Sequence, residues 1–318
     1  MDYNRKVGNP DKLYDVIIIG SGPAGLSAAI YTIRFGLSTL VISGFNWGGQ
    51  LMTTTVVENY PGFPEGINGP DLMRRMLNQA ARFGVEFVDY NAEKLEVNEG
   101  KFRVYAGGAW YKGLTVIVAT GARYRELGLN SEKRLLGRGV SYCAVCDGYF
   151  FKDGVVAVVG GGDTALTDAL YLSEIVKKIY IIHRRQEFRA SEALVNEVMR
   201  RDNIEVLWNR VVLDILGNKK VEALKLLNKE TGKEEIVKVD GVFIAIGHIP
   251  NSDLVKDLVE LTPKGYIKTK DFVKTSVPGL YAAGDVMDPK YQQAVTAAGF
   301  GVMAAIEAKQ YIDSFKRK

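Results

Sequence analysis

Cysteine and histidine are scarce in this chain of 318 residues, which contains two of each. Two cysteines cannot form the disulfide scaffold of a small secreted protein. The net charge is only +4 and no run of five basic residues occurs, so the composition does not indicate a nucleic-acid-binding protein. The apolar run 14–31 is interrupted by Asp15, Pro23 and three glycines, so we expect neither a signal peptide nor a membrane span there.

The remaining composition is that of an ordinary globular protein. Hydrophobic residues make up 47% of the chain and charged residues 25%. At roughly 150 residues per domain, the length suggests about two domains. A Cys-x-x-Cys pair outside a small secreted protein is typical of a reducing compartment. We therefore expect a cytoplasmic protein in which residues 1–13 form a mostly exposed lead-in.

The two cysteines lie close together in Ser141-Tyr-Cys-Ala-Val-Cys-Asp-Gly148 and are followed at once by an acid. Two thiols at this spacing can close to a disulfide and reopen, and a nearby charge or a helix N-terminus tunes their thiolate forms. A zinc half-site is the main alternative, disfavoured because His183 and His248 are the only histidines. An inert structural disulfide is a second alternative. The segment predicts a redox-active dithiol.

Glycine-rich loops occur on both sides of this segment. The β-branched run 15–19 predicts a strand buried on both faces, followed by Gly20-Ser-Gly-Pro-Ala-Gly25, a helix over 26–35 and a strand over 37–42. The run 155–159 is followed in the same order by Gly160-Gly-Gly-Asp-Thr-Ala165, a helix over 164–175 and a strand over 178–182. Each loop can hold a pyrophosphate on backbone N–H groups, or can be a glycine-rich packing turn.

A second strand in each half ends in small residues, over 114–122 in the first and 242–247 in the second. Paired features in the same order predict two copies of one dinucleotide-binding architecture. Near the C-terminus, residues 278–285 predict another strand with a Gly-Asp end, and residues 292–311 predict a helix crowded with Ala and Gly. Small side chains let such a helix approach another backbone or a ligand closely, with plain helix packing as the alternative.

The two halves differ where a nucleotide ribose is usually held. NAD sites carry an acid about 20 residues after the first glycine. Counting 23 residues from that glycine leads to Ser43 in the first half and to His183 in the second. His183 begins the stretch His-Arg-Arg-Gln-Glu-Phe-Arg, and guanidinium groups bind a 2′-phosphate that a carboxylate would repel. This favours NADPH over NADH in the second half, with a solvated basic turn as the alternative.

With these motifs in place, the chain strongly resembles the low-molecular-weight thioredoxin reductases over nearly its whole length after residue 13. The matching motifs are residues 20–25, 48–51 with 58–59, 119–122, 143–148, 160–165, 183–185 and 282–287. The resemblance implies an α/β fold of two Rossmann-like three-layer domains, the second inserted into the first. It implies a discontinuous FAD-binding domain of residues 1–124 and 253–318 and an NADPH-binding domain of residues 125–252 that carries the Cys-x-x-Cys pair.

The resemblance also implies the chemistry. Electrons pass from NADPH through FAD and the Cys143–Cys146 pair to oxidised thioredoxin or a thioredoxin-like protein, and the enzyme is a homodimer. Cys146 faces the flavin, Cys143 attacks the partner's disulfide, and Asp147 gives or takes the thiol proton, with a turn residue as the alternative for Asp147. Because the nicotinamide and the dithiol must both reach one flavin, we expect the inserted domain to rotate about linkers near Tyr124 and Ser252.

The residues expected to bind cofactors lie on these loops, strand ends and helix start. Those on the FAD side are Gly20, Ser21, Gly22, Pro23, Ala24, Gly25, Ser43, Gly48, Gly49, Gln50, Leu51, Asn59, Thr120, Gly121, Gly284, Asp285, Gln292, Gln293 and Ala294. Those on the NADPH side are Gly160, Gly162, Asp163, Thr164, His183, Arg184, Arg185, Arg189, Ile246 and Gly247.

Two of these residues depart from the family pattern. Gln292 stands where the family often has Arg, so that one cationic contact is lost or supplied elsewhere. Asp163 stands where many relatives have Asn. An acid facing a pyrophosphate is unfavourable, so we expect the carboxylate of Asp163 to turn toward backbone donors.

Two other functions are compatible with a flavoprotein of this kind. One is coupling to a ferredoxin or flavodoxin, which needs no dithiol. The other is a redox sensor whose thiols report to a partner without turnover. The sequence also leaves open whether the partner is thioredoxin, a glutaredoxin-like protein or a peroxidase subunit.

Overall fold

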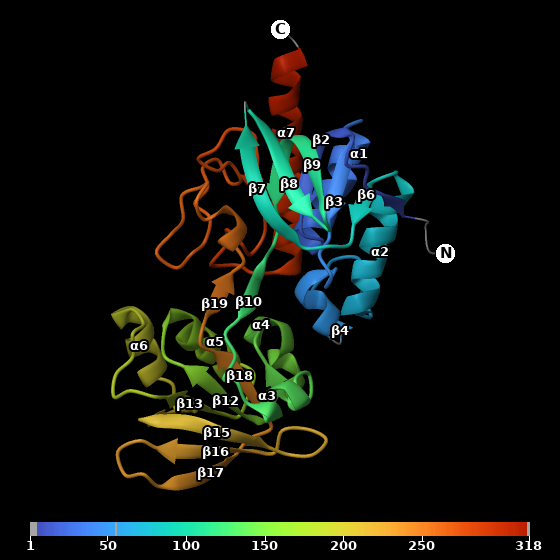
Figure 1. The fold of residues 1–318 in the computed structure, drawn as a ribbon. Coiled ribbons are helices and arrows are strands. Elements are labelled where there is room, and N and C mark those ends of the chain that lie inside the picture. Colours follow the sequence, from blue (N-terminus) through green and yellow to red (C-terminus); the bar gives the residue numbers. More distant parts are fainter. Residues whose placement is uncertain (1–4, 55, 99, 317–318) are drawn as a thin grey trace. The chain divides into compact units, whose positions relative to one another are not determined.

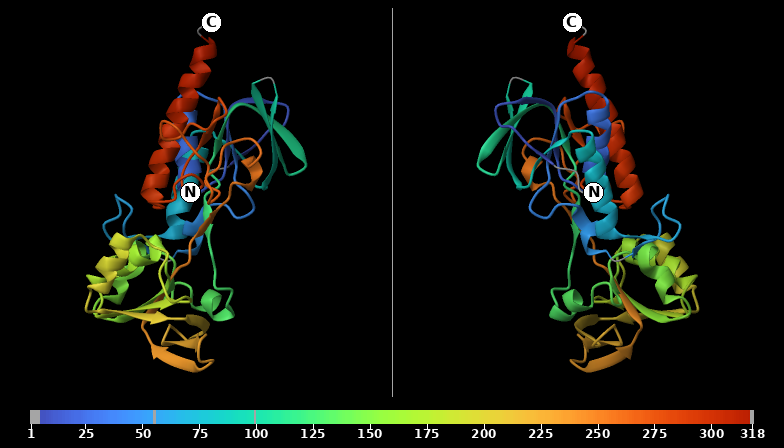
Figure 2. Two further views of the ribbon diagram at one scale, coloured as in Figure 1. Left: turned by 90° about the vertical axis from the view of Figure 1, so that its left-hand side faces the viewer. Right: turned by 90° about the vertical axis from the view of Figure 1, so that its right-hand side faces the viewer.

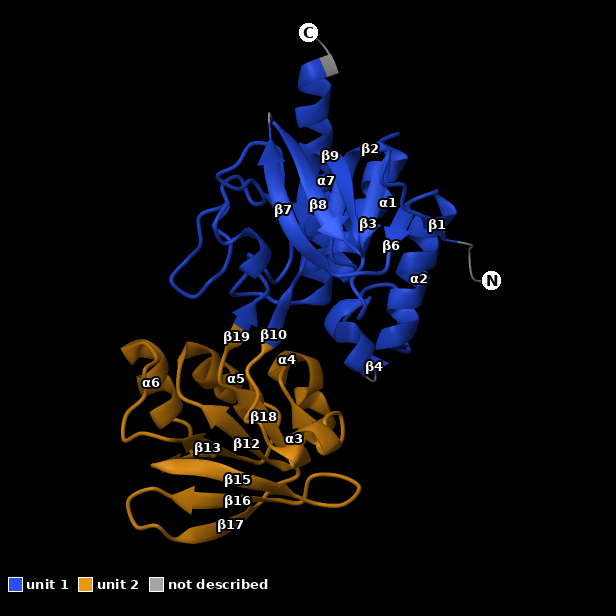
Figure 3. Cartoon of the chain, in the orientation of Figure 1, with its two compact units in different colours: residues 1–123, 249–318 blue, residues 124–248 orange. Residues whose placement is uncertain are grey.

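The computed structural model describes residues 5–54, 56–98 and 100–316 (Figure 1). Residues 1–4 of the expected lead-in and Thr55 lie outside the described residues. The chain forms two compact units, residues 1–123 with 249–318 and residues 124–248 (Figure 3). The chain passes between the units through two short strands that pair with each other, β10 (Ala122–Tyr124) and β19 (His248–Pro250).

The first unit is built on an eight-stranded sheet. Its strands run in the order β1 (Lys6–Val7), β6 (Glu86–Val88), β3 (Thr39–Ile42), β2 (Leu13–Ile19), β9 (Ala109–Val118), β8 (Lys101–Ala106) and β7 (Ala92–Asn98), and β20 (Leu280–Ala282) also pairs with β9. The strands from β1 to β9, and β20, pair in parallel, whereas β8 and β7 continue as antiparallel strands. The described part of the lead-in is mostly exposed, as predicted, and also contributes β1.

Both faces of this sheet are covered. Val16 and Ile18 of β2 point into a core beneath the helices, and Ile17 and Ile19 point into a second core on the opposite face. This alternation explains why β2 is an unbroken β-branched run, because a strand buried on both faces has no polar side. The helices on the first face are α1 (Pro23–Arg34), α2 (Gly69–Arg82) and α7 (Ala294–Lys316). The second face carries η3 (Asp253–Val255) and the segment that leads to β20.

The small residues of α7 bring it against the backbone of α1 (Figure 2). A Cβ on Gly301 would lie 2.1 Å from the carbonyl oxygen of Ala24, so that only glycine fits there. Of the two uses predicted for these small residues, close approach to another backbone is confirmed for this stretch. The helix begins at Ala294 and not at Gln292, because Gln292 has a φ of +47° and its N–H donates to Asp288.

The long connection between β3 and α2 holds a short helix and a hairpin. They are η1 (Gly49–Thr53), β4 (Val56–Val57) and β5 (Ile67–Asn68). A Cβ on Gly69 would lie 2.2 Å from the carbonyl oxygen of Leu51, so the start of α2 packs directly on η1. The connection is therefore packed against the start of α2.

The second unit has three layers. Its central sheet is parallel, in the order β11 (Val140–Ser141), β18 (Gly241–Ala245), β12 (Val155–Gly160), β13 (Lys178–His183) and β14 (Ile204–Trp208). The core on one face is shared with helical elements, α4 (Ala144–Asp147), η2 (Gly148–Phe151), α5 (Asp163–Ser173) and α6 (Glu192–Met199). The core on the other is shared with α3 (Asn130–Leu135) and an antiparallel sheet of β15 (Arg210–Leu216), β16 (Ala223–Asn228) and β17 (Glu234–Lys238).

The internal repeat predicted from the sequence is confirmed in the topology. The order β3-β2-β9 in the first unit matches β13-β12-β18 in the second, with the helix after β2 corresponding to the helix after β12. The predicted α/β class with two Rossmann-like three-layer domains is also confirmed. Among the residues that the structure describes, no helix combines the length and the apolar character that crossing a membrane requires.

Candidate functional site

Cys143 and Cys146 are joined by a disulfide in the second unit, with their Cα atoms 5.3 Å apart. Cys143 follows β11 and is the N-cap of α4. Its Sγ accepts a hydrogen bond from the backbone N–H of Cys146 at 3.2 Å. A donor aimed at sulfur favours the thiolate, so this geometry suits Cys143 as the thiol that ionises when the disulfide is opened.

The acid beside the disulfide is partly withdrawn from water. Burial raises the pKa of the Asp147 carboxyl above its ordinary value, and a hydrogen bond with the Ser141 side chain acts in the opposite direction. Ser141 also accepts the backbone N–H of Cys143 at 3.0 Å, which ties the end of β11 to the disulfide. Asp147 therefore keeps its proton to a higher pH than an exposed aspartate and is a suitable proton donor to a thiolate.

Exposed apolar side chains lie on the two short helical elements that contain and follow the disulfide. Val145 is 51% exposed, Tyr149 66% and Phe150 55%. We call these three residues the disulfide rim. Cys146 is exposed and Cys143 half-buried. Large apolar groups gathered in water beside a reactive bond are typical of a protein-docking surface.

In the first glycine-rich loop, two glycines lie against backbone atoms and a third has free space beside it. A Cβ on Gly20 would lie 2.2 Å from the carbonyl oxygen of Ala119, and one on Gly25 would lie 2.0 Å from that of Gly20. A Cβ on Gly22 would meet no atom within 4 Å. Gly22 is the N-cap of α1 and no side chain caps the helix, so its first N–H groups are available to an anion such as a pyrophosphate.

The second loop repeats this arrangement. A Cβ on Gly160 would lie 2.4 Å from the carbonyl oxygen of Ala245, whereas one on Gly162, the N-cap of α5, would meet no atom within 4 Å. The carboxylate of Asp163 accepts the backbone N–H of Ser191 at 2.8 Å. This confirms that Asp163 turns toward a backbone donor, which leaves the loop open to an anion.

Other residues predicted to bind FAD gather beside the first loop. The Ser21 hydroxyl donates to the carbonyl oxygen of Ser43 at 3.0 Å and accepts the N–H of Gly48 at 3.1 Å. A Cβ on Gly49 would lie 3.4 Å from the Cα of Gly22, which places the two glycine-rich segments side by side. Pro23 and Ala24 lie on the first turn of α1 and Leu51 lies on η1.

The strand ends and the start of α7 join the same group. Asn59 and Gln293, 234 residues apart, are linked by a hydrogen bond of 3.3 Å between their side-chain amides, next to Ala294 at the start of α7. Gln50 donates to the carbonyl oxygen of Ala122 at 2.6 Å, beside Gly121, and Thr120 donates to that of Asn251 at 2.7 Å. Thr120, Gly121 and Ala122 follow β9, whose carboxyl end lies at the same edge as those of β2 and β20.

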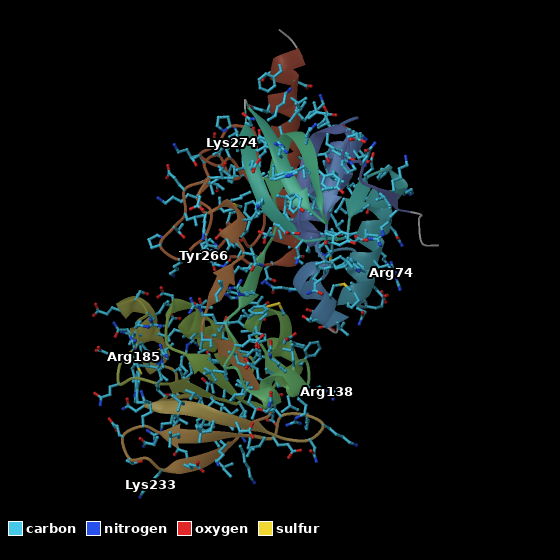
Figure 4. All side chains as sticks on the ribbon, viewed as in Figure 1. Arg74, Arg138, Arg185, Lys233, Tyr266 and Lys274 are labelled. Carbon is cyan, nitrogen blue, oxygen red and sulfur yellow. A yellow bond between two sulfur atoms is a disulfide. The ribbon has the colours of Figure 1, made fainter. Side chains whose placement is uncertain are left out.

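Asp285 follows β20 and Gly284. Burial, with a smaller effect from Asp288, raises the pKa of Asp285 to about 6. Gln292 directs its amide to the hydroxyl of Tyr266, which Figure 4 labels, at 3.3 Å. The side chain at the position of the family's Arg therefore makes a neutral contact.

Asp89 was not among the residues predicted from the sequence. Its carboxylate accepts the Ser43 hydroxyl at 2.7 Å, and it follows β6, the strand next to β3 in the sheet. It also pairs with Arg5 at 3.0 Å. Ser43 occupies the position at which an NAD site carries its acid. In this chain an acid lies beside that position in the fold, but Asp89 comes 46 residues after Ser43 in the sequence. Only the strand order could have revealed it.

The residues predicted to bind NADPH lie on the loops after β12, β13 and β18. We call residues 184–189 the arginine loop. Arg184, Arg185 and Arg189 are exposed, Arg185 is labelled in Figure 4, and within the described ranges none of the three forms an ion pair with a carboxylate. Thr164 lies on the first turn of α5, and Ile246 and Gly247 follow β18, where Gly247 has a φ of +106°.

The imidazole of His183 does not face outward with these arginines. It is buried beneath the loops, and both ring nitrogens contact backbone carbonyl oxygens. Arginine side chains, open backbone N–H groups and the disulfide follow strands of one parallel sheet and so share its carboxyl edge. The second unit thus carries a disulfide, a glycine-rich loop and exposed arginines at one edge of its sheet.

Comparison with known proteins agrees with this combination. Residues 14–301 match the family of pyridine nucleotide-disulphide oxidoreductases. The chain is 46% identical over 303 residues to a thioredoxin reductase of Rickettsia conorii, covering 94% of this chain and 98% of that protein. It is also 46% identical to a bifunctional thioredoxin reductase/thioredoxin of Mycobacterium leprae, and the match spans 95% of this chain but 66% of that longer protein.

A solved structure gives the same result for the fold. The crystal structure of thioredoxin reductase from Streptococcus pyogenes superposes with a TM-score of 0.90 at 41% identity, and the match covers 95% of this chain and 99% of that one. The glycine loops, the disulfide and these matches agree over nearly the whole length. The chain therefore belongs to the pyridine nucleotide-disulphide oxidoreductases and, among them, to the thioredoxin reductases, with Cys143–Cys146 as its redox-active centre.

Proposed function

We propose that this enzyme takes electrons from NADPH and passes them through FAD and the Cys143–Cys146 pair to the disulfide of thioredoxin or a thioredoxin-like protein. Membership of the family implies binding of FAD and of NAD(P)H. The observation that carries the proposal is the disulfide itself, which shares one sheet edge with an open glycine-rich loop and with three arginines that form no ion pair among the described residues. A ferredoxin-coupled flavoprotein would need no such dithiol.

The residues of the first unit fit FAD. The open N–H groups at the start of α1 would hold its pyrophosphate, Ser43 and Asp89 would lie at its ribose, and Asp285 would contact its ribitol chain. In the second unit, the N–H groups at the start of α5 and the arginine loop would hold NADPH. Bound FAD supplies the chemistry of accepting a hydride from NADPH and delivering two electrons to a disulfide.

The thiols then exchange with the partner. Two electrons and two protons open the disulfide to two thiols, and the Cys143 thiolate attacks the partner's disulfide, forming a mixed disulfide and releasing one partner thiol. The Cys146 thiolate then attacks the Cys143 sulfur, which releases the second partner thiol and restores the Cys143–Cys146 bond. Asp147 holds the proton that these thiolates gain or lose.

A protein partner is supported by two observations. The disulfide rim offers apolar groups on which a folded partner can dock. The Mycobacterium leprae relative is named as both thioredoxin reductase and thioredoxin, which makes thioredoxin the first partner to test. The homodimer and the cytoplasmic location expected from the sequence stay predictions.

The nicotinamide and the dithiol both belong to the second unit, while FAD would be held by the first. We propose that the second unit rotates about β10 and β19 so that each reaches the flavin in turn. A chemical cross-link that joins the two units should lower turnover at least tenfold, an order of magnitude expected where a domain motion gates catalysis, and should leave bound flavin in place. The control is protein that carries the reagent attached at only one of its two ends, so that the units stay unlinked. Turnover of the fully cross-linked sample equal to that of this control would contradict the rotation.

Removal of the acid should slow the thiol chemistry in a pH-dependent way. Because protonated Asp147 is the donor, the rate of disulfide opening should fall as pH rises through its pKa, and Asp147→Asn should lower the rate about 10²-fold and remove this limb. Ser141→Ala removes a hydrogen bond that lowers the pKa of Asp147, so it should move the limb to higher pH. Stopped-flow rates from pH 5 to 10 test both variants, and an unmoved limb in Ser141→Ala would assign it to another group.

The overall proposal has a direct test. The purified protein should show a flavin spectrum, lose it on addition of NADPH, and regain it when oxidised thioredoxin is added. Colourless protein prepared with FAD present, or a spectrum that stays bleached with every disulfide protein tried, would refute the proposed electron path. If NADPH bleaches the flavin and only a non-protein acceptor restores its spectrum, the result would favour the redox-sensor function.

A further inference from the structure

His183 ends β13 between two loops that the proposed nucleotide site needs. Its side chain is 4% exposed. Nδ1 lies 2.9 Å from the carbonyl oxygen of Gly160, and Nε2 lies 3.0 Å from that of Glu187. The first oxygen belongs to the start of the glycine-rich loop and the second to the arginine loop. The imidazole ring therefore bridges the two loops.

The surroundings of the ring hold it in this place. A Cβ on Gly161 would lie 2.1 Å from Nδ1, so that only glycine leaves room for the imidazole. The ring centroids of Phe188 and Trp208 lie 5.4 and 5.9 Å from that of His183. The N–H of Arg189 donates to the carbonyl oxygen of Gly161 at 2.8 Å, a second link between the same two loops. The buried ring nitrogens thus have the two carbonyl oxygens as their partners.

A neutral imidazole can satisfy only one of these two contacts. A carbonyl oxygen only accepts hydrogen bonds, and neutral imidazole has one N–H to donate. In that state one ring nitrogen presents its lone pair to a carbonyl oxygen about 3 Å away, which is repulsive. The imidazolium ion has two N–H groups and can donate to both. One additional proton therefore completes the link between the loops.

The charges around the ring come from the arginine loop. The charged side chains that act on His183 are Arg189 and Arg185, while Phe188, Trp208 and the two carbonyl groups are uncharged. Burial, and to a smaller extent these two arginines, lower the pKa of His183. A 2′-phosphate on the arginines would offset their repulsion of the imidazolium ion.

We propose, resting on the proposed NADPH site, that His183 is a positioning residue which joins the glycine-rich loop to the arginine loop and takes up a proton when a 2′-phosphate binds. The protonated ring fixes the arginines relative to the pyrophosphate-binding N–H groups. Coenzyme without the 2′-phosphate leaves the ring neutral. Recognition of the phosphate is thereby coupled to a buried group that does not touch it.

Nuclear magnetic resonance of the imidazole nitrogens tests this directly, because the chain has only two histidines. Holoenzyme labelled with ¹⁵N-histidine is titrated with NADP⁺ and, separately, with NAD⁺, and His248→Gln assigns the remaining signals to His183. At neutral pH the His183 nitrogens should change from one protonated and one unprotonated to both protonated with NADP⁺, and should not change with NAD⁺. No substitution at His183 is needed for this measurement.

A second measurement compares wild type with His183→Gln by calorimetry in buffers of different ionisation enthalpy. Wild type should take up as much as one proton more per NADP⁺ than the variant. Its affinity for NADP⁺ relative to the variant should rise as pH falls, by up to about tenfold per pH unit between the free and bound pKa values. The 2′-phosphate itself titrates near pH 6, but it does so in both proteins and cancels in the comparison.

The possible failures are distinguishable. A His183 ring that stays neutral with NADP⁺ bound, or an equal proton uptake in wild type and in folded His183→Gln, overturns the positioning role and leaves the proposed function standing. Equal dissociation constants for NADP⁺ and NAD⁺ at every pH overturn the coenzyme assignment and this inference with it.

Discussion

Replacing Cys143 with serine should abolish the reduction of a disulfide protein while leaving bound FAD reducible by NADPH. Serine keeps the shape of the side chain but cannot form the disulfide, and its hydroxyl does not ionise in the neutral range. Loss of a nucleophile typically costs about 10⁴-fold or more in turnover. NADPH oxidation with oxidised thioredoxin measures the loss, and anaerobic bleaching of the flavin measures what remains.

Cys146→Ser is the matched control and separates the roles of the two thiols. It should also stop turnover, but its free Cys143 should attack thioredoxin and form a mixed disulfide that does not go on to reduced thioredoxin, because the Cys146 thiol that completes the exchange is missing. Non-reducing electrophoresis detects this adduct, which Cys143→Ser should not form. An adduct with Cys143→Ser in place of Cys146→Ser would reverse the assignment of the attacking thiol. Loss of flavin reduction in both variants would mean that the cysteines also support the cofactor.

Replacing Arg184 and Arg189 together with alanine should weaken NADPH far more than NADH. Each charge-assisted hydrogen bond is worth about 1.5–3 kcal/mol, so that two lost guanidinium groups raise the dissociation constant for NADPH about 10²- to 10⁴-fold. NADH carries no 2′-phosphate, and its dissociation constant should change less than about threefold, within the usual range of exposed substitutions. Titration of each coenzyme, in its oxidised form, into the holoenzyme measures both values.

Arg138→Ala provides the control for a general loss of positive charge. Arg138 is exposed and precedes β11, so it lies at the amino edge of the sheet whose carboxyl edge carries the arginine loop. Its removal should leave both dissociation constants unchanged. Equal weakening of NADPH and NADH in the double variant would refute a 2′-phosphate site on the arginine loop, and weakening by Arg138→Ala would attribute the effect to long-range charge.

Much of the architecture could be predicted because it follows from local pattern. An unbroken β-branched run can only be a strand covered on both faces, and the glycines after β2 and β12 occur where a strand turns directly into a helix. The Cys-x-x-Cys spacing places the two thiols within one turn of a helix, where they are close enough to form a disulfide. The topology confirms the repeat because both halves contain the same short-range signals in the same order.

Other features required the fold. Asp89 lies beside Ser43 because β6 pairs with β3, and Asn59 contacts Gln293 because α7 returns to α1 from the far end of the chain. Nothing near these residues in the sequence predicts such partners, since strand order and helix packing are decided by burial over the whole unit.

His183 has one property that could be predicted from the sequence and one that only the tertiary structure decided. Its position at a strand end, followed by arginines, was determined by the sequence and pointed to the coenzyme. The direction of its ring was decided by tertiary packing, because Gly161 leaves the space, Trp208 packs beside the ring, and two carbonyl oxygens from separate loops meet there. Local pattern determines where the backbone turns, whereas the partners of a buried polar group depend on segments that only the folded chain brings together.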